Sequence, residues 1–354
     1  MSNCTESDLG RRDIIGLAVI AQTGLLSATF ALVFFGLVLR NVIVQRRHPF
    51  QRHIDVYLAS LFTADIFQGL FAAMDWRWAI TRKVVCGAHC TIQGVVIQFG
   101  SAGVSMSTLA ITIHTFCVVF FGWTPPPSKR VPVCIVSAIW LYSACVVLVG
   151  LTVHQGKGRK DSFYLPTPFW CWIYDSTPVR VICDLFWLNL TMVVSIVTYV
   201  PLFFTLRGNI VVVPNGDRWY SYKVTFVRHP NPVQRVGISS NSAQTRLAAA
   251  KMLWYPFTHL LAVTTDVARG KLMAHIGPNT PVKDIPFIPI AVTHVLYSMT
   301  GAADVLLVYF TRPNILLFGE PVPERHSCGI ARPRLGSGGR SDPEDRMRFS
   351  PKSG

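Results

Sequence analysis

Residues 91–121 read TIQGVVIQFGSAGVSMSTLAITIHTFCVVFF, and this stretch decides the fold class because it contains no Asp, Glu, Lys or Arg. An α-helix rises 1.5 Å per residue, so about 20 apolar residues cross a hydrocarbon layer roughly 30 Å thick. The stretch is long enough to do so. We interpret it as one membrane-spanning helix.

Six further stretches have the same character in a chain of 354 residues that is 51% hydrophobic and only 14% charged, with a mean hydropathy of +0.39. Such a composition is typical of a membrane protein rather than of soluble domains. The first stretch is too long for the core of a signal peptide and lacks a convincing cleavage site, so we expect it to be retained. The sequence predicts an all-α membrane protein with a seven-helix bundle, whose helices lie at about 14–39, 56–74, 91–121, 131–153, 180–206, 247–266 and 286–310.

The distribution of Lys and Arg predicts the orientation of this bundle. Lys and Arg are more numerous in the loops on the side of the membrane that holds the carboxyl terminus than in the loops on the opposite side. The more basic side of a membrane protein tends to stay cytoplasmic. We therefore expect an extracellular amino terminus (1–13), a third cytoplasmic loop at 207–246 and a cytoplasmic tail at 319–354 that is too poor in apolar residues to fold alone. The basic cytoplasmic side would then account for most of the net charge of +15 and would attract anionic lipid and acidic protein partners. No nucleic acid is needed to explain this charge.

Four of the nine cysteines would lie on the oxidising, extracellular side. Cys171 lies in the loop between the fourth and fifth spans, and Cys90 stands at the start of the third. A bond between these two would fasten the loop over the bundle, so it is favoured; Cys86 is the alternative partner of Cys171, and Cys4 would pair with whichever cysteine remains. Asn3-Cys4-Thr5 is also a candidate glycosylation site on that side.

Ionisable side chains inside the spans are costly and therefore point to function. Asp65 and Asp304 would share a proton, a cation or a water cluster if the second and seventh spans are neighbours. His114, His259 and His294 fall in the third, sixth and seventh spans, but at different predicted depths. We accordingly expect no metal site.

Two further features concern motion and binding. Pro256, like Pro201, removes a backbone hydrogen bond from its span and would act as a hinge between the membrane and the third cytoplasmic loop. The aromatic residues at the outer end mark the mouth of the bundle, where aromatic belts also occur without binding anything. The candidate residues of an extracellular ligand pocket are Trp76, Trp78, Gln98, Trp170, Trp172, His259 and His294.

Several motifs resemble those of fungal seven-helix G-protein-coupled receptors related to glucose-sensing and cyclic-AMP-receptor-like proteins. They are HCTIQGVVIQFG, LAITIHTF, FWCWI, YVPLFFTLRGNI, KMLWYPFTHLL followed by ARG, and GAADVLLVYFTRP, and the resemblance covers about residues 14–318. It implies a rhodopsin-like bundle, a ligand entering from outside, a heterotrimeric G protein bound inside, a Cys90–Cys171 disulfide and a functional acid at Asp65.

The sequence departs from that family in three places. His114-Thr115-Phe116 stands where many receptors carry an acid-arginine-aromatic switch. His259 replaces a tyrosine, and Asp304 stands where an asparagine would be expected. Asp304 adds a second acid to Asp65, and this strengthens the hypothesis that the protein responds to protons or cations.

The function that these observations predict is a plasma-membrane receptor that passes an extracellular signal, such as a nutrient or small molecule, to a G protein and the cyclic-AMP pathway. The alternative is a seven-helix transporter or channel, which predicts internal repeats and a polar path that the sequence does not display. We expect neither an enzyme nor a cofactor, since no nucleotide-binding glycine loop, no soluble catalytic domain and no lysine in the last span for retinal is found. The candidate coupling residues are Lys129, Arg130, Arg207, Arg246, Lys251 and Arg312.

Overall fold

The structure is a computed structural model. It describes residues 7–45, 53–123, 125–126, 128–155, 163–173, 177–207, 209–214, 222–227 and 286–311. The chain divides into two units, Met1–Gly319 and Glu320–Gly354, and every described residue belongs to the first.

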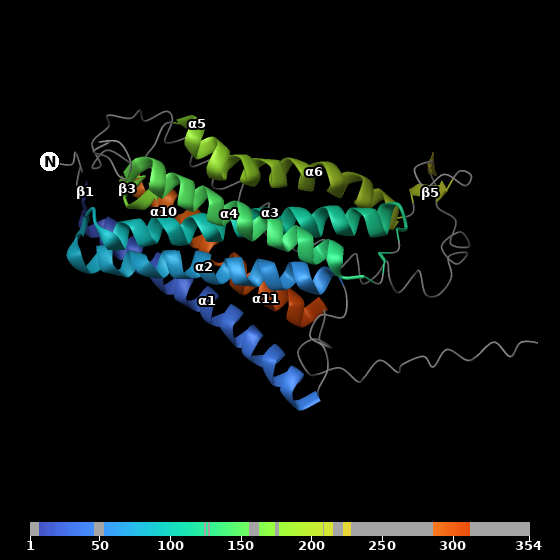
Figure 1. The fold of residues 1–354 in the computed structure, drawn as a ribbon, viewed down its shortest axis with the longest axis horizontal. Coiled ribbons are helices and arrows are strands. Elements are labelled where there is room, and N and C mark those ends of the chain that lie inside the picture. Colours follow the sequence, from blue (N-terminus) through green and yellow to red (C-terminus); the bar gives the residue numbers. More distant parts are fainter. Residues whose placement is uncertain are drawn as a thin grey trace, which may run out of the picture. The chain divides into compact units, whose positions relative to one another are not determined.

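Long apolar helices form the described part of the chain (Figure 1). Six segments in it are long and apolar enough to cross a membrane, whereas the predicted span at 247–266 lies outside the described residues. Four of the six are single helices, α1 (Arg11–Gln45), α2 (His53–Thr81), α3 (Ala88–Phe120) and α4 (Arg130–Gln155). The predicted second span ended at about residue 74, but α2 continues to Thr81, so Trp76 and Trp78 lie on the helix itself.

The other two membrane-length segments are interrupted. The fifth predicted span consists of a short helix α5 (Thr177–Arg180), a π-helical turn η1 (Val181–Leu185) and α6 (Phe186–Arg207), which contains Pro201. The last consists of α10 (Phe287–Ser298) and α11 (Thr300–Thr311), separated at Met299. Such interruptions change the pattern of backbone hydrogen bonds and are frequent at functional sites.

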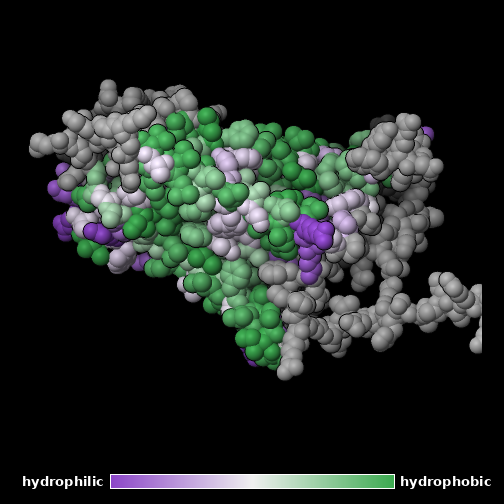
Figure 2. Space-filling model, viewed as in Figure 1, coloured by the Kyte–Doolittle hydropathy of each residue, from purple (hydrophilic) through white to green (hydrophobic). Residues whose placement is uncertain are grey.

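Helix α3 is the centre of the bundle, since it packs against α2, α4 and α6. Helix α1 lies along α2, and both contact α10 or α11. The α1–α2 approach depends on two glycines: a Cβ at Gly69 would lie only 2.7 Å from the carbonyl oxygen of Gly24. Green apolar residues cover the flanks of the helices, and purple hydrophilic residues gather toward their ends (Figure 2), as a lipid-facing surface requires.

Three antiparallel strand pairs complete the described fold, and the all-α prediction did not include them. They pair β1 (Ser7–Asp8) with β2 (Lys83–Val84), β3 (Tyr164–Thr167) with β4 (Trp170–Ile173), and β5 (Ile210–Pro214) with β6 (Tyr222–Phe226). In the β3–β4 hairpin Pro166 lies opposite Cys171. These strands are only two to five residues long, too short for an alternating pattern to identify them.

Candidate functional site

A disulfide fastens the β3–β4 hairpin to the first turn of α3. The sulfur atoms of Cys90 and Cys171 are 2.03 Å apart, and the bond joins positions 81 residues apart in the sequence. The predicted pairing is therefore confirmed. The alternative with Cys86 is wrong, because Cys86 is itself disulfide-bonded elsewhere.

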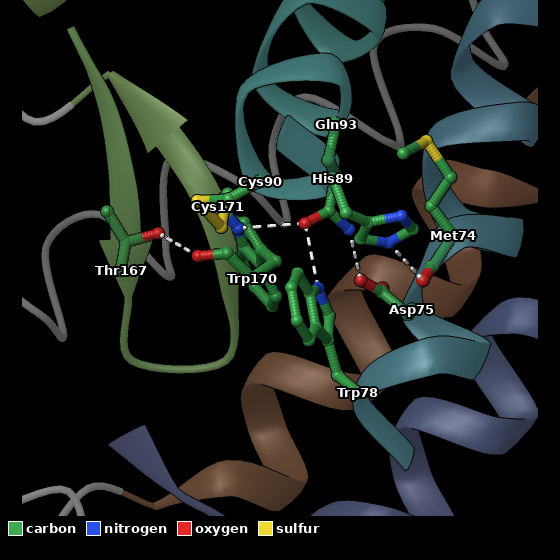
Figure 3. The surroundings of a disulfide bond; sticks show 9 residues. All are labelled: Met74, Asp75, Trp78, His89, Cys90, Gln93, Thr167, Trp170 and Cys171. Carbon is green, nitrogen blue, oxygen red and sulfur yellow. Dashed lines mark hydrogen bonds between the residues drawn. A yellow bond between two sulfur atoms is a disulfide. The ribbon is translucent and has the colours of Figure 1, made fainter. Parts of the chain in front are cut away.

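Gln93, one turn after Cys90, joins this hairpin to the outer end of α2 (Figure 3). Its Oε1 accepts hydrogen bonds from the indole N–H of Trp78 (2.8 Å) and from the backbone N–H of Cys171 (3.0 Å). Its Nε2 donates to Oδ1 of Asp75 at 2.7 Å. Gln93, Trp78 and Asp75 are all fully buried. An amide is suited to this place because it accepts and donates at the same time.

The loop between β3 and β4 and the start of β4 lie on α10. The ring centroids of Phe169 and Phe287 are 4.7 Å apart, and those of Trp170 and His294 are 4.5 Å apart. Phe71 of α2 lies on another side of His294, at 5.5 Å. The disulfide-bound hairpin, α2 and α10 thus share one aromatic cluster. We call the β3–β4 hairpin with its disulfide the outer lid.

The predicted pocket residues are distributed unequally around this lid. Trp170 and His294 are brought together, whereas Trp78 is sealed into the Gln93 network and Trp76 is 46% exposed. Trp172 lies against the guanidinium of Arg180, whose central carbon is 5.8 Å from the ring centroid.

Beneath the lid, polar side chains of α3 face the π-helical turn η1. Gln98 donates from Nε2 to the carbonyl oxygen of Cys183 (2.8 Å), and the hydroxyl of Ser101 donates to Oδ1 of Asp184. The Tyr164 hydroxyl and Oε1 of Gln98 are buried and have no hydrogen-bond partner within the described residues. Burial, followed by the proximity of Cys183 and Asp184, raises the pKa of Tyr164 and keeps its phenol neutral.

A second polar centre lies where α2 meets the break between α10 and α11. Gln68 donates from Nε2 to the carbonyl oxygen of Tyr297 and, at 3.0 Å, to the hydroxyl of Thr300. The hydroxyl of Ser27 on α1 accepts the N–H of Ala302 at 3.0 Å. A helix end leaves backbone groups to be paired. Side chains of α1 and α2 perform that pairing here.

Asp65 and Asp304 belong to the same centre. Asp65 is 1% exposed, and neither carboxyl oxygen has a hydrogen-bond partner within the described residues. Its Cβ and Cγ lie beside Gly301, one turn before Asp304, and Asp304 is also buried. Spans two and seven are therefore in contact at the two acids.

At the opposite end of α3, His114 lies in an aromatic group. Its ring centroid is 6.0 Å from that of His53, 5.7 Å from that of Tyr57 and 5.8 Å from that of Trp123. The basic residues Lys129, Arg130 and Arg207 are exposed near the ends of α4 and α6.

Other predicted residues are not brought together or cannot be placed. Within the described ranges no group of three or more His, Cys, Asp or Glu side chains is arranged to hold a metal ion. The residues Asn3, Arg246, Lys251, Pro256, His259 and Arg312 lie outside the described part of the chain.

The prediction from sequence missed the residues that connect these centres. Gln68 and Asp75 of α2, and Gln93 and Ser101 of α3, were not among the predicted candidates, whereas Asp65 and Gln98 on the same two helices were. Buried polar residues at helical spacing within apolar spans were the available signal. Among the three buried amides Gln68, Gln93 and Gln98, Gln98 alone was a predicted site residue.

Comparison with known proteins shows a likeness of fold. No protein-family model matches the sequence, and no curated protein matches it. Among solved structures, a crystal structure of squid rhodopsin is similar, with a TM-score of 0.55 and 13% sequence identity over 87% of this chain and 85% of that one. The chain therefore has the rhodopsin-like seven-helix fold, in which six of the membrane-length segments are described here.

Proposed function

We propose that the protein is a receptor of the G-protein-coupled type, which binds an extracellular ligand and passes the signal to a heterotrimeric G protein at the cytoplasmic end. The observation that carries this proposal is a continuous connection. The disulfide-bound outer lid packs on α10 through Trp170 and His294, and α10 leads into the break that Gln68 and Ser27 hold. A change at the lid thereby reaches the polar centre.

The ligand site that we propose lies under and beside the lid. Trp170, Trp172, His294 and Gln98 would line it, together with Ser101 and Asp184. Trp78 would support the lid through Gln93 without touching the ligand, because its indole N–H is already used there. A ligand changes the balance of two packings only by binding one more tightly than the other.

The switch that we propose is the contact of α2 with α10 and α11. Asp65 and Asp304 lie in that contact, and two buried acids are stable together only when a proton or cation reduces their repulsion. Signalling that depends on pH or sodium is the expected consequence. Asp304→Asn should remove most of that dependence in a reporter assay across pH and sodium concentration, and an unchanged dependence would exclude this switch.

The coupling surface would include Lys129, Arg130 and Arg207, which are exposed at the predicted cytoplasmic end. Their positive charge suits an acidic partner. Membership of the fungal family related to glucose-sensing and cyclic-AMP-receptor-like proteins, coupling to the cyclic-AMP pathway and residence in the plasma membrane rest on the sequence motifs.

The test is to express the chain with a panel of G proteins linked to a reporter and to screen sugars, cyclic nucleotides, lipids and peptides. A ligand response that disappears with His294→Ala and is retained with Trp76→Ala would support the proposed site, because Trp76 lies on the same face of the membrane but is exposed. No response with any G protein, together with measurable solute flux, would favour the transporter.

A further inference from the structure

The β5–β6 hairpin that follows α6 has one apolar face. Cross-strand partners share a face of a hairpin, and successive residues alternate between faces. Ile210 is paired with Phe226, Val212 with Val224, and Pro214 with Tyr222. The partners on that face are therefore apolar or aromatic, while on β6 Lys223 and Thr225 lie on the other face, paired with Val213 and Val211 of β5.

This apolar face is only partly covered. Tyr222 packs on Phe121, with ring centroids 4.9 Å apart, and Phe226 contacts Phe204 at 6.0 Å. Phe226 is nevertheless 68% exposed and Val224 is 53% exposed. Apolar side chains left this open in water are unfavourable, so a second apolar environment is indicated.

The hairpin is held close to the end of the membrane-spanning helix. The N–H of Asn209 donates to the carbonyl oxygen of Phe204 (2.9 Å), and the N–H of Val227 donates to the carbonyl oxygen of Asn209 (2.8 Å). The Asn209 side chain adds a bond to the carbonyl oxygen of Val227 at 3.2 Å. The apolar segment of this span ends at Thr205, and the hairpin begins shortly after it, at Ile210.

The exposed apolar surface of α6 continues onto the hairpin. Val193, Val197, Val200 and Phe203 recur at helical spacing and are all about half exposed or more, as a lipid-facing stripe should be. Phe204 stands at the edge of this stripe, one position after Phe203, and its ring meets Phe226. The lipid-facing surface therefore extends past the end of α6.

We propose that the β5–β6 hairpin lies in the membrane interface, with Val224 and Phe226 in the outer part of the hydrocarbon and Lys223 on the wet side. Two features select lipid as the occupant: continuity with the stripe on α6, and the alternation of β6, whose Val224 and Phe226 lie on one face and whose cation Lys223 lies on the other, as suits an interface with anionic headgroups. The hairpin would thus fix the direction in which the third loop leaves the bilayer. The inference does not depend on a receptor function.

The experiment places an environment-sensitive fluorophore on the full chain in lipid nanodiscs. Val224→Cys is labelled in a background in which the free cysteines are replaced, and Lys223→Cys, its neighbour on the opposite face, is the matched control. Quenching by brominated lipid and by aqueous iodide is measured for both. Phe226→Cys gives a second, independent position on the apolar face.

We expect brominated lipid to quench the label at 224 and at 226 at least about twofold more than the label at 223, with the opposite order for iodide. Equal lipid quenching at 223 and 224, or stronger iodide quenching at 224, would overturn the proposal. So would a label at 224 that becomes shielded from iodide only when a G protein is added, because the face would then be a protein-binding surface.

Discussion

Exchanging the donor and acceptor between Gln93 and Asp75 tests whether their hydrogen bond holds the outer lid to α2. Gln93→Glu still accepts the N–H groups of Trp78 and Cys171, but it presents an oxygen where Nε2 now donates to Asp75 at 2.7 Å. Two buried carboxyl groups then face each other, and both oxygens are acceptors unless the pair shares a proton. At a pH high enough to remove that proton we expect a loss of about 2–4 kcal/mol in the free energy of unfolding, from the missing bond and the unpaired oxygen.

Adding Asp75→Asn restores a donor to the pair, now from the other side. The double variant should recover at least about half of the loss, which corresponds to a coupling energy of roughly 1–3 kcal/mol. The loss of stability and its recovery are measured by thermal unfolding of each variant in nanodiscs, in which the fraction of unfolded protein is monitored as the temperature rises. At roughly 2–4 °C for each kcal/mol, the single variant should melt about 5–15 °C lower than the parent.

A matched control is available on the same helix. Gln98 is also fully buried but donates to the backbone carbonyl of Cys183, not to Asp75. Asp75→Asn should therefore give no rescue of Gln98→Glu. If it rescues both variants equally, or if Gln93→Glu leaves the melting temperature unchanged, the reasoning about the lid is refuted.

Three further predictions concern the disulfide, the polar centre and the buried phenol. Cys171→Ala opens a loop of 81 residues, which should cost about 4 kcal/mol and greatly reduce surface expression; normal expression and signalling would contradict this. Gly301→Ala would bring a methyl group within 2.7 Å of the Ser27 hydroxyl and 2.8 Å of Cβ of Asp65, so we expect melting to show a loss of about 1–3 kcal/mol. Burial raises the pKa of Tyr164, so above pH about 10 the unfolded chain alone loses this proton and stability falls; Tyr164→Phe should lessen that alkaline loss, and an identical pH profile would exclude it.

The sequence predicted some residues of the candidate site and not others. Asp65 and Asp304 stand out because an acid in an apolar span is conspicuous by itself. Gln68 and Gln93 do not, since the role of an uncharged amide in a long apolar helix depends on the partners to which it bonds. Gln68 bonds to residues more than 200 positions away in the sequence. No local pattern contains that information.

The local sequence was also misleading at the edges of elements. The aromatic residues Trp76 and Trp78 suggested an interface loop, but α2 continues through both. Trp78 is then buried by its bond to Gln93, whereas Trp76, two positions earlier, faces outward. On a helix, residues two apart point in different directions, so the boundary of α2 decided their roles.

The sequence by itself determined that this is a membrane protein built from apolar helices, because hydrocarbon admits only long apolar segments whose backbone bonds are satisfied internally. It also determined which residues would be costly there. Only the tertiary structure decided which cysteine pairs with Cys171, which amides join α2 to α3 and to the α10–α11 break, and how the hairpins lie. Those outcomes depend on contacts between distant parts of the chain, whereas insertion into the bilayer depends on each segment alone.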